Sequence, residues 1–96
     1  AVDAVGETVQ QAVEVDADLL ITHHPLLMRG VTSVSEELYK GNLIAQLIRG
    51  NVALLAAHTN ADVVENGVSD VIATSLGLQD STPLQPGVVA GTGIVL

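Results

Sequence analysis

The chain has 96 residues, a formal net charge of −8 and no cysteine. This length suffices for one small domain, and the lack of cysteine excludes disulfides and thiolate metal ligands. The acidic balance disfavours contact with a phosphate backbone, so nucleic acid is not an expected partner. The apolar runs are far shorter than the roughly 20 residues that span a bilayer, so we expect no membrane segment. The absence of cysteine fits a cytoplasmic setting, which we expect for this protein.

Helical and strand patterns alternate along the sequence. Helical spacing predicts three helices, over residues 4–15, 36–49 and 68–76. Short apolar runs predict two buried parallel strands, over residues 19–22 and 52–57. Residues 1–2 read as the end of a further strand, so we expect the chain to be part of a longer protein. Asp3 is a candidate N-cap, while Gly50 and Gly77 are candidate helix ends. This order predicts an α/β fold with a parallel sheet and helical crossovers.

All histidines of the chain follow predicted strands. His23 and His24 come after the strand over residues 19–22, and His58 comes after the strand over residues 52–57. Ligands of open α/β sheets bind at the carboxyl ends of the strands. The three imidazoles therefore predict a metal site at this edge of the sheet.

His23 and His24 are adjacent in sequence. Successive side chains of a strand point to opposite sides, so we expect that the two rings cannot easily chelate one ion. Each ring would instead serve one of two ions, which in two-metal sites lie roughly 3.5–4 Å apart. In the alternative interpretation, one histidine caps backbone groups and the other is solvated.

His58 and Asp62 are four residues apart in a predicted loop over residues 58–66. If this loop starts with one helical turn, both side chains face the same way, and a carboxylate beside imidazoles suits a transition metal. The alternative is that Asp62 caps the next segment. Asp3 has a second interpretation as well, as a carboxylate that orients a ligand imidazole.

Two blocks of the sequence resemble a known family. ADLLITHHPLL (residues 17–27) is similar to the DLIITHHPL signature of the Nif-three-like dinuclear-metal family, the type-two GTP cyclohydrolase I homologues. AHTNAD (residues 57–62) with GVSD (residues 67–70) resembles the HTNLD…GGVND segment of that family. The resemblance implies a three-layer α/β fold around a parallel-rich sheet, of which this chain is a fragment, and assembly into toroidal homohexamers.

The resemblance also implies roles for individual residues. His23 would bind one metal ion, His24 the other and Asp62 the first, with His58 beside or on the metals as a catalytic proton shuttle or ligand. The family takes further ligands from a C-terminal His-x-x-x-Glu motif that this chain lacks. Residues 1–78 would form the metal-binding α/β lobe, and residues 79–96 a linker or the start of a further segment.

The expected function is a hydrolase that depends on two divalent ions (Zn, Fe or Mn). Its small-molecule substrate would be a GTP-like heterocycle with a hydrolysable C–N bond, as the family resemblance implies. The alternative is a non-enzymatic protein, either a hexameric metal-binding scaffold or a regulatory interaction protein.

Overall fold

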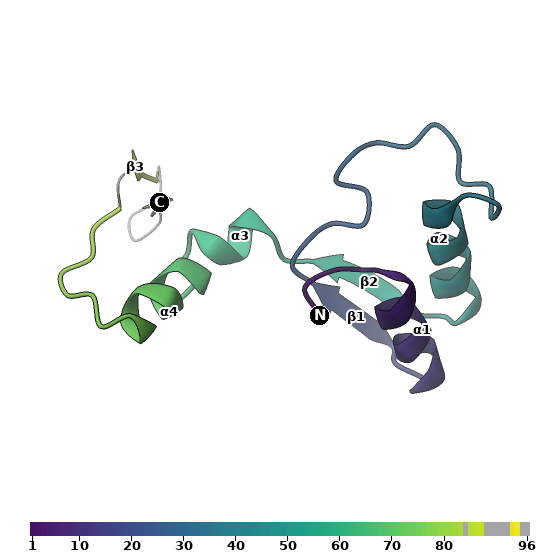
Figure 1. Ribbon diagram of the computed structural model, residues 1–96, viewed down its shortest axis with the longest axis horizontal. Helices are drawn as coiled ribbons and strands as arrows, with labels where there is room; N and C mark the ends of the chain where they lie inside the picture. The colour runs from purple at the N-terminus through teal and green to yellow at the C-terminus, as the bar shows by residue number, and fades with distance from the viewer. Residues whose placement is uncertain (84, 88–92, 95–96) are drawn as a thin grey trace. The chain divides into compact units, whose positions relative to one another are not determined.

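The computed structural model describes residues 1–83, 85–87 and 93–94, and it divides the chain into two compact units. The first unit, residues 1–58, alternates helices and strands (Figure 1). Its elements are α1 (Gly6–Glu14), β1 (Leu19–Thr22), α2 (Tyr39–Arg49) and β2 (Ala53–Ala56). The candidate histidines all belong to the first unit.

The two strands of the first unit are parallel neighbours, as the sequence predicts. In their register Leu20 lies opposite Leu54 and Thr22 lies opposite Ala56. The backbone nitrogen of Ala1 donates to the carbonyl of Ile21 at 2.9 Å, and the His23 N–H lies 3.2 Å from the Ala1 carbonyl. These two bonds have the slanted arrangement of a parallel ladder. The start of the chain therefore lies against β1, although residues 1–2, predicted as a strand end, are not a strand and the sheet of this unit consists of β1 and β2.

Helices α1 and α2 pack against each other and share one aliphatic core with the sheet. The buried core residues are Ala4, Val9, Ala12, Leu43, Leu47 and Val52. Leu20 and Leu54 pack against this core from the strands, whereas Leu19, Ile21 and Leu55 are 46%, 51% and 52% exposed. Because side chains alternate across a strand, residues 1–58 form two layers, with both helices on one face of the sheet. The opposite face of this unit presents exposed aliphatic side chains.

The start of α1 differs from the prediction. The N-cap is Val5, not Asp3, and the Val5 N–H donates to the hydroxyl of Thr8 at 3.0 Å. The prediction that Asp3 caps this helix is therefore wrong, because the Asp3 carboxylate is hydrogen-bonded to Nδ1 of His24. Helix α2 also starts later than predicted, at Tyr39, because residues 36–37 form a turn and Leu38 is extended.

Gly50 is the C-cap of α2, as predicted. Close packing, and not a left-handed backbone, favours glycine at this position. Its backbone is right-handed, and the left-handed position after the helix is taken by Asn51, with φ of 54°. A Cβ atom on Gly50 would lie 2.7 Å from Cγ2 of Val13. Glycine is therefore needed here for the close approach of α1 to the end of α2.

The second unit begins with residue 59. Its elements are α3 (Thr59–Asp62), α4 (Val68–Ser75) and an antiparallel pair of short strands, β3 (Gln85–Pro86) and β4 (Gly93–Ile94). Helix α4 ends at Ser75, one residue earlier than predicted, and Gly77, the predicted stop signal, has a left-handed φ of 73°. The Leu78 N–H closes this turn on the Ala73 carbonyl at 3.0 Å. The loop predicted over residues 58–66 instead contains the single turn α3.

Part of the segment predicted as a linker, residues 79–96, lies outside the described residues, at positions 84, 88–92 and 95–96. No helix in the described part of the chain has the length and hydropathy needed to cross a bilayer.

Candidate metal centre

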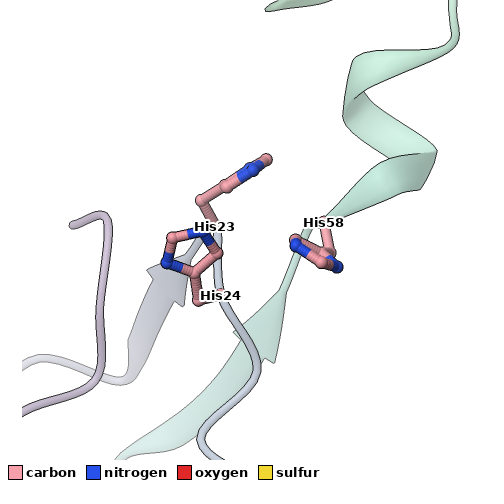
Figure 2. A group of neighbouring side chains, drawn as sticks. All are labelled: His23, His24 and His58. Atoms are coloured by element: carbon pink, nitrogen blue, oxygen red, sulfur yellow. The ribbon is translucent and has the colours of Figure 1, made fainter. Parts of the chain in front are cut away.

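The candidate site lies where β1 and β2 end. His23 and His24 directly follow the last residue of β1, and His58 follows β2 after one intervening residue. Since the strands are parallel neighbours, their carboxyl ends meet at one edge, and Figure 2 shows the three imidazoles grouped there. The sequence-based prediction that all histidines converge at this edge is confirmed.

The three rings are mutual neighbours. Their centroids are 4.9 Å apart for His23 and His24, 5.0 Å for His23 and His58, and 5.4 Å for His24 and His58. One ring nitrogen of each residue lies within 4.8 Å of the other two. Two metal–nitrogen bonds of about 2.1 Å span at most about 4.2 Å across an ion. The cluster is therefore close to the size of a single-ion site, and it is also small enough to face a pair of ions.

Adjacent histidines come close because they are not part of the strand. Strand β1 ends at Thr22, and both histidines lie in the bend that follows. Alternation of side chains across a pleated strand does not apply to a bend. The rings of His23 and His24 thus lie close together, with centroids 4.9 Å apart, and the assignment of each ring to its own ion stays a prediction.

Two of the imidazoles are held through Nδ1. The Nδ1 atom of His23 lies 3.0 Å from the carbonyl oxygen of Ala57, and the Nδ1 atom of His24 lies 2.8 Å from Oδ1 of Asp3. A carbonyl and an ionised carboxylate only accept hydrogen bonds, so both Nδ1 atoms carry the proton and donate. In both residues Nε2 is then the atom suited to bind a metal.

Solvent can reach the site. His23 and His58 are half-buried, and the side chain of His24 is 44% exposed. A small molecule can therefore approach the cluster without a rearrangement of residues 1–58. The chain has three basic residues, Arg29, Lys40 and Arg49, and all three belong to the first unit.

Asp62, the fourth residue predicted in the site, is the last residue of α3 and belongs to the second unit. The helical turn that the prediction required is present, since α3 starts at Thr59, directly after His58. The role of Asp62 as a ligand stays a prediction.

The sequence-based reasoning missed two backbone-centred contacts of the site. The carbonyl of Ala57 holds His23, and the hydroxyl of Thr22 donates to the carbonyl of His24 at 2.9 Å. A backbone carbonyl leaves no mark in the residue types. Thr22 did carry a signal, as the single hydroxyl at the end of an otherwise aliphatic strand.

The donor set fits a divalent transition-metal ion. Three imidazoles converge, no thiolate is available, and imidazole suits zinc and iron among the common metals. Fold and site together define an α/β protein segment with a three-histidine candidate metal centre at the carboxyl edge of a parallel sheet.

The chain belongs to the Duf34/NIF3 (NGG1p interacting factor 3) family, whose model matches residues 1–96. It is 51% identical over 86 residues to a GTP cyclohydrolase 1 type 2 homolog of Streptomyces coelicolor, covering 90% of this chain and 30% of that protein. A homolog of the same name from Mycobacterium tuberculosis is 46% identical, with 90% and 22% covered. The chain thus spans less than a third of these curated relatives.

Solved structures agree with this assignment. The crystal structure of a Bacillus cereus protein related to NIF3 matches with a TM-score of 0.82 and 36% identity, over 90% of this chain and 24% of that one. Reduced HcgD from Methanocaldococcus jannaschii matches with a TM-score of 0.79 and 29% identity, over 86% and 33%. The family resemblance and the predicted α/β fold class, as a fragment of a larger domain, are confirmed.

Proposed function

We propose that this chain is the metal-binding segment of a hydrolase that acts on a C–N bond of a GTP-like heterocycle and depends on two divalent ions. The observation that carries the proposal is the convergence of His23, His24 and His58 at the carboxyl edge of β1 and β2. The names of the bacterial relatives, GTP cyclohydrolase 1 type 2 homologs, supply the substrate class. We propose a cytoplasmic location for the same protein.

Each candidate site residue of this chain has a proposed role in metal binding or proton transfer. Nε2 of His23 and Nε2 of His24 would each face an ion, and Asp62 would complete the ligands from this segment. Bound divalent ions of this kind acidify water and polarise a substrate oxygen. His58, whose ring lies 5.0 Å from that of His23 and 5.4 Å from that of His24, would bind as well or would move a proton between water and substrate.

The triphosphate of GTP would need cationic partners in this segment. Of the three basic residues, Arg49 is held by Glu36 through two hydrogen bonds of 2.5 and 2.6 Å. Arg29 and Lys40 would then be the cations of this segment that could meet a triphosphate.

The test uses the full-length protein that contains this chain. We would load it with Mn²⁺, Fe²⁺ or Zn²⁺, measure bound metal, and follow formate release from GTP and from related purine heterocycles. Wild type should turn over at least one of these compounds only when metal is bound. H23A should lose metal and turnover, whereas Q11A, an exposed change on α1, should keep both. Absence of metal-dependent turnover with all compounds would overturn the hydrolase.

His58→Ala separates the two roles of His58. Loss of turnover with unchanged metal content would assign it as the proton carrier, and loss of metal would assign it as a ligand.

The second candidate is a non-enzymatic metal-binding hexamer or regulatory interaction protein. Its support is the family description, which names an interacting factor, and the exposed aliphatic face of Leu19, Ile21 and Leu55. Native mass spectrometry of wild type, H23A and H24A decides between the candidates. A hexamer that persists without metal, in a protein that turns over none of the compounds, would favour the scaffold.

A further inference from the structure

The carboxylate of Asp3 contacts one of the three imidazoles, that of His24. Its Oδ1 lies 2.8 Å from Nδ1 of His24, although the two residues are 21 positions apart in the sequence. Since an ionised carboxylate only accepts, the bond fixes the proton of the neutral ring on Nδ1 and leaves the lone pair on Nε2. A metal ion would thus meet His24 in the tautomer that binds it.

The backbone around Asp3 is fixed on both sides. The hydroxyl of Thr8 donates to the Asp3 carbonyl at 2.8 Å, and the His24 N–H donates to the Val2 carbonyl at 2.9 Å. The Thr8 hydroxyl also accepts the hydrogen bond from the Val5 N–H, so the Asp3 side chain is not needed to cap α1. The carboxylate is therefore aimed at the imidazole by the same contacts that join the start of the chain to β1.

The group that holds His24 is charged. Nδ1 of His24 faces a carboxylate, which carries a full negative charge. A charged acceptor strengthens the hydrogen bond from the imidazole and makes the free ring nitrogen a better ligand for a cation. Asp3 would accordingly strengthen the binding of a cation by His24.

We propose that Asp3 is a positioning residue of the metal centre, which fixes the tautomer and direction of His24 and strengthens the binding of a metal ion by His24. The inference rests on the proposed metal binding, and it adds a residue that takes no part in coordination. It predicts that the loss of Asp3 weakens metal binding although all three histidines remain.

The experiment compares D3A, D3N and D3E in the full-length protein with D18N. Asp18 is an exposed carboxylate at the opposite end of β1, so D18N makes the same chemical change away from the site. Metal-free samples would be examined by ¹⁵N NMR for the tautomer of His24, and Zn²⁺ affinity would be measured by competition with a chelator. Circular dichroism would check that each variant is folded.

In wild type we expect His24 to carry its proton on Nδ1. D3A should bind Zn²⁺ about 10- to 100-fold more weakly. D3N, which still accepts a hydrogen bond but lacks the charge, should fall between D3A and wild type, D3E should recover part of the affinity, and D18N should match wild type. Should D3A itself be unfolded, the near-isosteric D3N decides.

Two results would overturn the inference and are distinguishable from each other. If wild type binds Zn²⁺ and D3A or D3N binds it equally well, Asp3 has no positioning role while the proposed function stands. If wild type binds none of the divalent metals, the proposed function and this inference fall together.

Discussion

The hydroxyl of Thr22 donates a hydrogen bond of 2.9 Å to the backbone carbonyl of His24, two residues further along the chain. Thr22 is 1% exposed and faces the core at the last position of β1. The bond therefore anchors the bend that carries both adjacent histidines to a residue buried in the core. It makes the geometry of the site depend on the core.

Thr22→Val tests this coupling. Valine fills the same space without the hydroxyl, so the bend should lose its anchor, unfolding free energy should fall by about 1 kcal/mol, and Zn²⁺ should bind more weakly. Thr22→Ser is the control, because it removes a methyl group but keeps the donor. Urea denaturation and Zn²⁺ titration of both variants would check it. Equal Zn²⁺ affinity in T22V and T22S would show that the bond does not shape the site.

Asp62→Asn tests the predicted ligand of the second unit. If Asp62 coordinates a metal, D62N in the full-length protein should lower metal affinity by about 10-fold or more, since even outer-sphere changes reach that size. Glu65→Gln removes an exposed carboxylate from the same unit and should leave the affinity unchanged. Metal analysis after dialysis against a weak chelator gives the readout. Unchanged metal content in D62N would remove Asp62 from the site.

Gly41→Ala tests how closely the loop before α2 lies on that helix. A Cβ atom at Gly41 would overlap the carbonyl oxygen of Ser35 and lie 2.6 Å from that of Val34, and both are backbone atoms that cannot rotate away. We expect a loss of about 1–3 kcal/mol in unfolding free energy. Gly6→Ala is the matched control, because nothing lies within 4 Å of its added Cβ and a small gain is expected. Denaturant unfolding of both would show the difference, and equal stability would contradict the packing.

Glu36 and Arg49 predict a weak dependence of stability on pH. The hydrogen bonds from Arg49 hold the pKa of the Glu36 carboxyl below its ordinary value of 4.5. A carboxyl with a lowered pKa in the folded state stabilises the fold above its unfolded pKa, and this contribution is lost as the pH falls through the folded pKa. Because the side chains are 50% and 69% exposed, the effect should be small and should shrink with salt.

E36Q should thus be slightly less stable than wild type at pH 7, with the difference disappearing as the medium is acidified below pH 4.5. Urea midpoints across this range are the measurement. E37Q, an exposed change at the next position, should show no such convergence. A difference between E36Q and wild type that persists in acid would assign the effect to packing.

The strands were well predicted from the sequence because the signal is local. The apolar run that ends at Thr22 sits between a charged residue and a bend, and the structure places β1 at the predicted residues. The second strand is one residue shorter at each end than predicted, as is usual for element boundaries. Helix starts were less accurate, because a cap depends on competition between partners. Asp3 suits an N-cap by residue type, but it is taken by an imidazole from a distant part of the chain.

The site was predictable as a gathering of residues and not as a geometry. Parallel strands bring their carboxyl ends together, so the meeting of His23 and His58 followed from the order of elements alone. The closeness of His23 and His24 depended on where β1 stops, and sequence patterns locate such ends only to within a residue or two. The acceptor of His23 is the Ala57 backbone carbonyl, which every residue type shares.

The bond between His23 and the Ala57 carbonyl joins positions 34 residues apart, with all of α2 in the intervening loop. The unfolded chain does not hold these two positions together, so a cation bound at this site would stabilise the folded state alone. At a free concentration 100 times its dissociation constant it would add about 2.7 kcal/mol to the unfolding free energy. The unfolding free energy of this small acidic segment would therefore depend directly on the concentration of available metal.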